Sequence, residues 1–392
     1  MTTFAVHRKE PLLVGPAAPT PCETKRLSDT DDQEVLRTHV PFVFFYRGGK
    51  GGVRSDDRRG RVADADVRLA ELEAADGLRP PFPCMDQLLF DVEGSSGVLN
   101  CPLLLIQVTR LLCGGFVFAF RLNHTICDAA GLAQFLSAVV EHARGLPSAP
   151  TVAPAWSRHL LEARRHPKPT FSHPEYEDDD DLPVPLSGDM VMRTFIFSSD
   201  DVNTIKNRLP PHLRNATTSF EALTAALWCT RTAALGLPPD DEVKLAIVVN
   251  FRRLPELALP AGYYGNAYMQ TVSVTTAGSL VAGGSLGDAV EMVRKAKASV
   301  TAEYVLSRLG QPSVVHANTF VVTDHRHAGF HRVDFGWGEP VYGGIAEGAF
   351  FGVSSLVAIK NGDGEDAVGV LMVLPQPAMD RFASEIQMLL KG

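Results

Sequence analysis

The chain has 392 residues, of which 45% are hydrophobic, and a formal net charge of −8 at pH 7. This length is sufficient for one large hydrophobic core or for two adjacent ones. The negative charge argues against a general affinity for nucleic acid.

The most apolar stretch, residues 102–122, is interrupted by Gln107, Arg110 and a Cys-Gly-Gly turn. We expect a hairpin there. No apolar segment follows a basic start either, so we predict neither secretion nor a membrane span. The six cysteines show no CxxC or other metal-ligand spacing. They indicate reduced thiols in a cytoplasmic protein without a bound metal.

An imidazole and a carboxylate lie four residues apart where a predicted strand gives way to a predicted helix. Residues 116–123 alternate between apolar and other side chains with the period of two typical of a strand that turns one face into a core. Residues 132–140 place their apolar side chains on one stripe of a helix. His124 and Asp128 occupy the junction, and Asp128 can accept hydrogen bonds from the free backbone N–H groups of the helix.

His124 can act as a general base because the pKa of an ordinary histidine lies close to physiological pH. Asp128 is better suited to organising the turn than to reacting. The alternative is that Asp128 only caps the helix and His124 is a polar strand end, because a lone His-x-x-x-Asp pattern is short and common.

The chain divides into two halves. Residues 147–181 are rich in Pro, His, Arg and Asp with little hydrophobic period, which is typical of a connector. Regular elements then resume: Thr218 and Glu221 form a capping-box pattern, residues 243–249 predict a buried strand, and residues 288–309 predict a helix. We therefore expect domains at 1–165 and 196–392, joined by a connector at 166–195.

A second motif, Asp-Phe-Gly-Trp-Gly, occupies residues 334–338. With His-Thr-Ile-Cys-Asp at 124–128 in this order, the chain resembles the plant BAHD acyltransferases. Further stretches are similar to that family, at residues 19–29, 218–227 and 259–266. The likeness covers most of the chain from residue 14 to 382 and is strongest to the benzyl alcohol O-benzoyltransferase branch. No P-loop, dinucleotide fingerprint or Gly-x-Ser-x-Gly elbow is present, which argues against nucleotide hydrolysis, hydride transfer and serine-hydrolase chemistry.

The resemblance implies a mixed α/β fold with two chloramphenicol-acetyltransferase-like domains and a substrate channel between them. It implies a cytoplasmic, monomeric enzyme without a permanent cofactor, which takes an acyl group from acyl-coenzyme A as co-substrate. The acceptor would be an alcohol or an amine. His124 would remove the acceptor proton.

The resemblance also implies roles for other residues. Asp128 would pair with Arg252 and so fix the loop that carries His124, while the family's second arginine of that stretch falls on Leu254. The Asp334 motif, with Gly336 and Gly338, would be architectural because its glycines permit tight turns. Trp337 is a candidate donor to the developing oxyanion. Four cations are candidates for the phosphates of coenzyme A, although such residues are more often solubilising charges: Arg253, Arg294, Lys295 and Lys297.

One segment departs from the family. Between Tyr46 and Val67 the chain is rich in Gly, Arg and Asp without a hydrophobic face, and it is short by roughly 40 to 50 residues, far more than ordinary loop variation removes. A helix and at least one strand of the first domain are expected to be absent. Two hypotheses follow: a working acyltransferase, with benzoyl as the favoured acyl group and benzyl alcohol as a favoured acceptor, or a truncated relative that only binds ligand.

Overall fold

The computed structural model describes residues 4–16, 18–49, 63–82, 85–95, 101–146, 149–163, 189–311, 318–347 and 353–391. Two compact units divide the chain. The first comprises Met1–Glu162, Leu259–Asn266 and Ala328–Glu347, and the second comprises Ala163–Ala258, Ala267–His327 and Gly348–Gly392. Each unit contains one sheet with helices packed on it, so the predicted two-domain α/β architecture is confirmed. Two short segments from the second half of the sequence belong to the first unit.

The sheet of the first unit has six strands in the order β1-β3-β4-β5-β2-β10. Their bounds are β1 Val6–His7, β2 His39–Tyr46, β3 Ala63–Ala65, β4 Leu104–Arg110, β5 Phe116–Asn123 and β10 Tyr342–Ile345. Neighbours are antiparallel except β3 and β4. Because β4 and β5 pair in register, Ile106 opposite Phe120, the predicted hairpin is confirmed.

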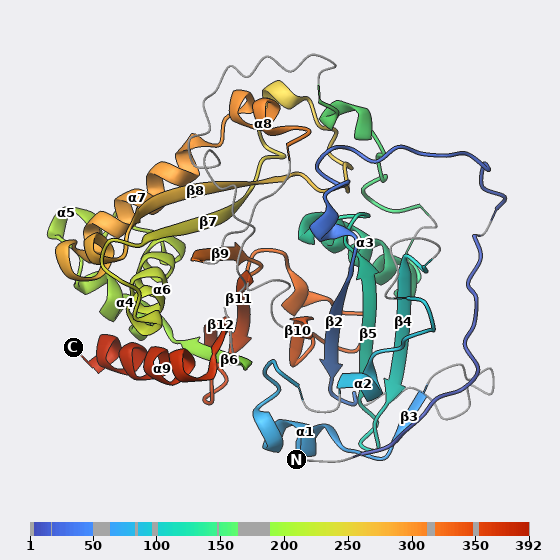
Figure 1. The fold of residues 1–392 in the computed structure, drawn as a ribbon. Coiled ribbons are helices and arrows are strands. Elements are labelled where there is room, and N and C mark those ends of the chain that lie inside the picture. Colours follow the sequence, from blue (N-terminus) through green and yellow to red (C-terminus); the bar gives the residue numbers. More distant parts are fainter. Residues whose placement is uncertain are drawn as a thin grey trace. The chain divides into compact units, whose positions relative to one another are not determined.

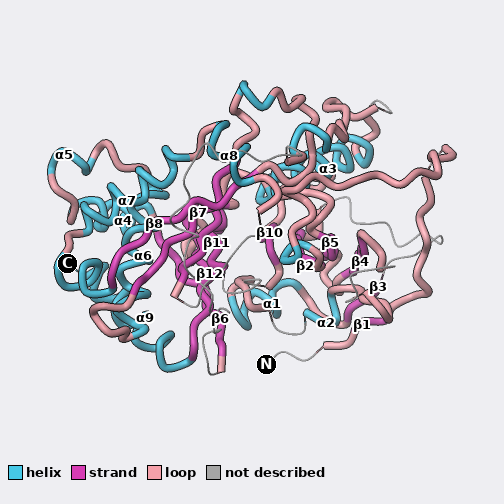
Figure 2. The backbone as a smooth tube through the Cα atoms, turned by 45° about the horizontal axis from the view of Figure 1, so that its top comes forward, coloured by secondary structure: helices cyan, strands magenta, loops and turns pink. Residues whose placement is uncertain are grey.

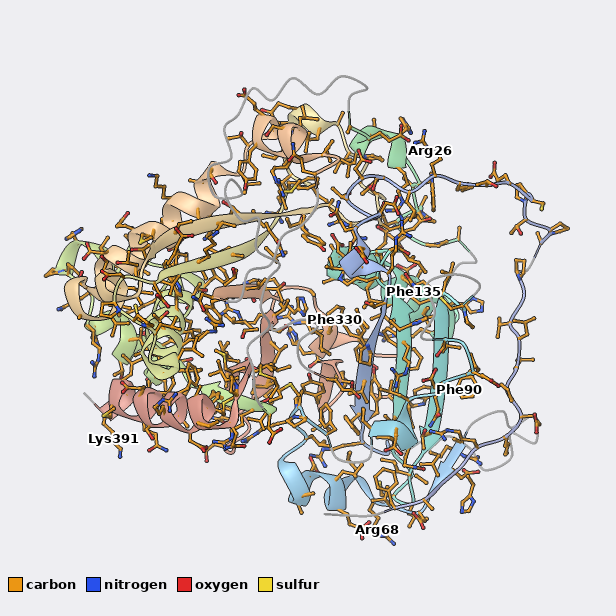
Figure 3. All side chains as sticks on the ribbon, viewed as in Figure 1. Arg26, Arg68, Phe90, Phe135, Phe330 and Lys391 are labelled. Atoms are coloured by element: carbon orange, nitrogen blue, oxygen red, sulfur yellow. The ribbon has the colours of Figure 1, made fainter. Side chains whose placement is uncertain are left out.

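The core of the first unit is aromatic. Every second residue of β2 and β5 faces α3 (Ala129–Ala143), which follows from the period of two along a strand. Phe330, labelled in Figure 3, closes this layer edge-on against Phe42, with 5.4 Å between ring centroids. The sequence predicted one buried face for β5, but Val117 and Ala119 on the other face are also fully buried. Two further helices belong to this unit, α1 (Leu69–Asp76) and α2 (Met85–Leu88).

The sheet of the second unit has the order β6-β12-β11-β9-β7-β8. Its strands are β6 Met190–Phe197, β7 Glu242–Asn250, β8 Tyr268–Thr276, β9 Thr319–Asp324, β11 Val353–Lys360 and β12 Asp366–Pro375. Only β9 runs parallel to its neighbours, β7 and β11. Its helices are α4 Ser199–Asn207, α5 Pro211–Arg214, α6 Ser219–Leu235, α7 Leu286–Ser299, α8 Ala302–Arg308 and α9 Gln376–Lys391. In Figures 1 and 2, α4, α6, α7 and α9 lie on one face of this sheet, where they enclose a core around Trp228.

Local signals in the second unit match the structure with one exception. Thr218 and Glu221 form the predicted capping box at the start of α6, and β7 includes the predicted strand. The single helix predicted for residues 288–309 is wrong. α7 ends at Ser299, and α8 begins after Thr301, whose hydroxyl accepts from the backbone N–H of Tyr304. A threonine that caps a new helix in this way ends the preceding one.

Some predictions fall outside the described residues. Residues 50–62, which hold most of the segment that departs from the family pattern, lie there, and so do residues 166–188 of the predicted connector. β6 begins at Met190, inside the range predicted for the connector. In the described part of the chain, no helix combines the length and the apolar character needed to cross a membrane. The five described cysteines are free thiols.

Candidate active site

The turn between β5 and α3 holds His124 at the end of a well-paired strand. The backbone N–H of His124 donates to the carbonyl of Thr38 at 2.9 Å, so the pairing extends one residue beyond β5. The side chain of Asn123 accepts from the hydroxyl of Thr125 at 2.7 Å, and the N–H of Ile126 donates to the carbonyl of Asn123 at 3.1 Å. The side chain of His124 is only partly exposed, and its Nδ1 is shielded from solvent. The imidazole therefore extends from a turn that is hydrogen-bonded on both sides.

Asp128 is the N-cap of α3, as its position before the amphipathic run predicts. Its Oδ1 accepts from the backbone N–H groups of Ala130 and Gly131, both at 3.0 Å. These donors have no partner inside the helix, so the carboxylate satisfies them and favours the helix start. A Cβ at residue 131 would lie 1.9 Å from the carbonyl oxygen of Tyr264, so only glycine permits this close approach. The cap thus fixes where the turn ends.

Beneath the turn lies a buried ionic cluster that the sequence analysis missed. Asp31 is fully buried, and its carboxylate accepts from Nη1 of Arg158 at 2.8 Å and from both the backbone N–H and Nδ2 of Asn266 at 2.8 Å. The N–H of Ser28 also donates to Asp31, at 3.3 Å, and its hydroxyl makes a further bond. We call Asp31, Arg158 and Asn266 the buried cluster.

The buried cluster reaches the turn through two backbone carbonyls. Nδ2 of Asn266 donates to the carbonyl of His124 at 2.9 Å, and Nη2 of Arg158 donates to the carbonyl of Ile126 at 2.7 Å. The guanidinium of Arg158 is enclosed by the rings of Trp156, Tyr263 and Tyr264, at 4.7, 5.4 and 4.9 Å from their centroids. The turn is therefore held by the side chains of Arg158 and Asn266, which are themselves held by Asp31.

The surroundings of His124 set its protonation. Burial lowers the pKa of His124 below its ordinary value of 6.5, while the charge of Asp128 and the side chain of Asn266 act in the opposite direction. Because burial outweighs these opposing contributions, the surroundings favour the neutral form of the imidazole. A neutral ring can accept a proton, which is what a general base requires.

The Asp334 motif lies at the other end of β5. Oδ1 of Asp334 accepts from the N–H groups of Gly336 and Gly338 at 2.7 and 2.8 Å, and both glycines have a positive φ, +107° and +106°. These bonds lower the pKa of Asp334. Phe335 packs edge-on against Phe118 at 5.3 Å. The motif forms a tight turn beside the first residues of β5.

The structure does not bring Trp337 to His124. Its ring packs edge-on against Phe116, the first residue of β5, at 5.4 Å, whereas His124 follows the last. Eight residues of extended strand separate the two positions, about 26 Å at the usual rise. A donor to an oxyanion must lie within about 3 Å of it, so this geometry gives Trp337 no such role.

Arg252 and Arg253 lie in the second unit, directly after β7. The N–H of Arg252 donates to Oδ1 of Asn250 at 2.9 Å, and its side chain is partly exposed, while Arg253 is exposed. The pairing of Arg252 with Asp128 stays a prediction.

The remaining coenzyme A candidates lie on α7. Arg294 and Lys297 both bond to Glu221 of α6, at 3.5 and 2.9 Å, and Lys295 is exposed. A phosphate would have to compete with Glu221 for the first two. Their role in binding coenzyme A stays a prediction, as does that of Lys295.

The buried cluster left only a faint signal in the sequence. Asn266 ends the stretch 259–266 and Asp31 follows the stretch 19–29, both of which carry the family resemblance, but nothing in either stretch pairs it with Arg158. The three residues are separated by 127 and 108 positions. Spacing patterns detect partners within one element, and contacts of this range come only from the fold.

Comparison with known proteins agrees with the fold. The model of the Transferase family matches residues 61–389. Benzyl alcohol O-benzoyltransferase of Petunia hybrida is 46% identical over 440 aligned positions, which cover 99% of this chain and 94% of that protein. (Z)-3-hexen-1-ol acetyltransferase of Arabidopsis thaliana is 41% identical, with 98% of this chain and 95% of that protein covered. The crystal structure of vinorine synthase superposes with a TM-score of 0.71 at 18% identity, covering 98% of both chains.

The chain therefore belongs to the Transferase family, the BAHD acyltransferases, and is an enzyme of that class. The alignment with the Petunia protein has 440 positions, 48 more than this chain has residues, so the relative has at least that many residues without a counterpart here. This agrees with the shortfall expected from the sequence.

Proposed function

We propose that the protein is an acyl-coenzyme A-dependent alcohol O-acyltransferase in which His124 is the general base. The observation that carries this proposal is the position of His124 on a turn fixed by Asp128 and by the buried cluster. Membership of the BAHD family supports the reaction class. Neither a metal nor a resident cofactor is part of the proposal.

The reaction needs one proton to move twice. The His124 imidazole accepts the proton of the alcohol as its oxygen attacks the thioester carbonyl, and a tetrahedral intermediate forms. The carbon–sulfur bond then breaks, and the coenzyme A thiolate takes the proton from the imidazolium. An ester and free coenzyme A leave, His124 is neutral again, and no covalent acyl-enzyme is required.

The proposed donor is an aromatic acyl-coenzyme A, benzoyl-coenzyme A in particular, and the proposed acceptor is a small alcohol such as benzyl alcohol. The name of the Petunia relative, at 46% identity, supports this pair. The name of the Arabidopsis relative, at 41%, supports acetyl transfer to an unsaturated aliphatic alcohol instead. An apolar pocket distinguishes neighbouring substrates by only about 1–3 kcal/mol per methylene, so related enzymes can differ in both substrates.

A thiol-release assay tests this function. Benzoyl-, acetyl- and hydroxycinnamoyl-coenzyme A are each paired with benzyl alcohol, hexenol and an amine, and free thiol is measured. We expect the highest kcat/KM for benzoyl-coenzyme A with benzyl alcohol. His124→Ala should lower kcat by about 100- to 10,000-fold, the usual contribution of a general base, with a nearly unchanged melting temperature. Comparable turnover by His124→Ala would exclude His124 as the base.

The pH dependence of the reaction provides a second test. Only neutral His124 can accept a proton, and burial lowers the pKa of this side chain below 6.5. We therefore expect kcat/KM to rise with pH through a midpoint below about 6.5 and to stay high at pH 7. A midpoint above pH 7 would mean that another group limits the rate or that negative charge near His124 outweighs its burial.

The alternative is a relative that binds ligand without turnover. The 48 or more positions missing relative to the Petunia protein favour testing it. Cooperative unfolding with a melting temperature raised by benzoyl-coenzyme A, but without thiol release for any pair of substrates, would support this alternative.

We also propose that the protein is a cytoplasmic monomer. The free thiols of the described cysteines are compatible with a reducing compartment. Light scattering coupled to size exclusion would test the oligomeric state, and a fluorescent fusion in plant cells would test the location.

A further inference from the structure

The buried cluster is built at an energetic cost that packing alone does not explain. Asp31 and Arg158 are 0% and 1% exposed, and removing two charges from water is unfavourable unless their geometry and hydrogen bonds compensate. Apolar residues of similar volume often replace buried ion pairs without loss of stability. The presence of this pair therefore suggests a task that apolar side chains cannot perform.

The cluster's contacts show which task that is. The carboxylate of Asp31 accepts from Nη1 of Arg158 and from Nδ2 of Asn266. Nη2 of Arg158 donates to the carbonyl of Ile126, and Nδ2 of Asn266 also donates to the carbonyl of His124. One carboxylate thus orients two donors onto the two carbonyls that flank Thr125.

The chain around the cluster leaves space for this arrangement. A Cβ at residue 265 would lie 1.3 Å from Nη1 of Arg158, so the glycine before Asn266 makes room for the guanidinium. On the far side, the hydroxyl of Thr30 donates to the carbonyl of Asn266 at 2.7 Å. Asn266 is fully buried and held through its backbone N–H, its carbonyl and its side chain.

We propose that Asp31, Arg158 and Asn266 are positioning residues for His124. By fixing the carbonyls on both sides of Thr125, they hold the backbone from which the imidazole extends, and so set where the ring nitrogen meets the acceptor hydroxyl. The cluster touches no reacting atom. This inference rests on the proposed function of His124. It assigns to the cluster the two turn carbonyls that neither the end of β5 nor the cap of α3 holds.

The test uses Asn266→Ala in the full-length protein, with Tyr46→Phe as a matched control. Both changes remove a buried donor to a backbone carbonyl in the same unit, because the hydroxyl of Tyr46 donates to the carbonyl of Val333 at 2.7 Å. Tyr46 lies at the far end of β2 from His39, which pairs with Asn123. The control therefore reproduces the lost hydrogen bond without touching the turn.

Four quantities are measured for each protein: the melting temperature, kcat and KM for benzoyl-coenzyme A with benzyl alcohol, and the NMR signal of the His124 ring. Histidine labelled with ¹³C at Cε1 gives one signal for each of the 12 histidines. His124→Gln identifies the His124 signal by its absence. Because this signal does not depend on turnover, it separates a failure of the positioning role from a failure of the proposed function.

We expect Asn266→Ala to lower kcat by about 10- to 100-fold, since a displacement of about 1 Å at a reacting group can cost 100-fold. KM should change little, and the His124 signal should move or broaden. Tyr46→Phe should leave kcat, KM and that signal as in the unaltered protein. An unchanged His124 signal in Asn266→Ala, or equal losses of kcat in both variants, would overturn the proposal.

Thr30→Val keeps the proposal testable if Asn266→Ala does not fold. It removes the hydroxyl that donates to the carbonyl of Asn266 and that also bonds to the hydroxyl of Ser28 at 3.0 Å, and it nearly preserves volume. The protein should therefore fold while the His124 signal moves by a smaller amount. A folded Thr30→Val whose His124 signal and kcat both match the unaltered protein would count against the cluster.

Discussion

Two motifs lie at opposite ends of β5, and they are held in different ways. The Asp334 turn is held mainly by its own residues: its carboxylate accepts from the N–H groups of Gly336 and Gly338, and its aromatic residues pack on the nearby start of the strand. Arg144 adds one longer ion pair from outside the turn, at 3.9 Å. The His124 turn depends on distant residues. Its carbonyls accept from Arg158 and Asn266, which lie 32 and 142 positions away from their partners.

The difference teaches what each motif can specify. A carboxylate that accepts from its own loop, followed by glycines with positive φ, encodes a local conformation. The pentad at 124–128 encodes the base and the helix cap, but the position of the base also requires Asp31, Arg158 and Asn266. We therefore expect the His124 turn to respond to substitutions far away in the sequence, and the Asp334 turn to respond mainly to its own residues.

The largest expected effect is that of Arg158→Met. It leaves the carboxylate of Asp31 buried without its counter-ion, which typically destabilises a protein by about 3–5 kcal/mol. Urea unfolding followed by circular dichroism measures the free energy of unfolding, and kcat should fall as well because the carbonyl of Ile126 loses its donor.

Arg110→Met is the matched control for this change. Arg110 makes a two-point bond to Asp64 in the same unit, at 2.7 and 3.0 Å, but both side chains are partly exposed. An exposed pair contributes at most about 1 kcal/mol. Equal destabilisation by the two variants would show that burial of the Asp31 pair has no special importance, and the contrast between the two turns would lose its basis.

Asp128→Ala should have the next largest effect. Loss of the cap on α3 costs about 1 kcal/mol, within a range of about 0.5–2, and kcat should fall because the end of the His124 turn is released. Thermal unfolding and the thiol-release assay measure the two losses. Asparagine caps helices about as well as aspartate, so Asp128→Asn should recover the stability and show how much of the rate depends on the charge.

An unchanged melting temperature in Asp128→Ala would contradict the role of this carboxylate as a cap. Ser285→Ala provides a reference, because Ser285 caps α7 in the second unit by accepting from the N–H of Asp288 at 3.2 Å. That variant should lose comparable stability without a change in kcat.

Much of the local structure could be predicted from the sequence, because its causes are local. The period of two in β5, the capping box of α6 and the position of Asp128 before an amphipathic run all depend on neighbours within a few residues. The same reasoning failed at Thr301, where the apolar stripe continues but a hydroxyl caps a new helix. The period of apolar residues indicates which face of a helix is buried, but it does not indicate where one helix ends and the next begins.

The site could be predicted only in part, for the same reason. His124 and Asp128 are adjacent in the chain, and their motif locates them. Asn266 belongs to a stretch between β7 and β8 that is part of the first unit, and no pattern in the sequence shows that it contacts Asp31. Trp337 illustrates the opposite error. Its motif is part of the family resemblance, but its ring packs on Phe116, which lies eight positions, about 26 Å, along β5 from His124.

The smallest effect on turnover is expected for Gly336→Ala. At a φ of +107° a side chain strains the backbone, by about 1–2 kcal/mol per residue in the left-handed region, and the new Cβ would meet only Cγ of Arg144 at an ordinary 3.8 Å. Thermal unfolding should show this loss, while kcat/KM at 25 °C should stay within about twofold, since no bond to the His124 turn changes.

Gly362→Ala, which adds a methyl group in open space, is the control for the substitution itself. A large fall in kcat/KM for Gly336→Ala, with stability and the His124 NMR signal preserved, would mean that the Asp334 turn acts in the reaction. The distinction between a structural turn held mainly by its own residues and a catalytic turn held by residues distant in the sequence would then be wrong.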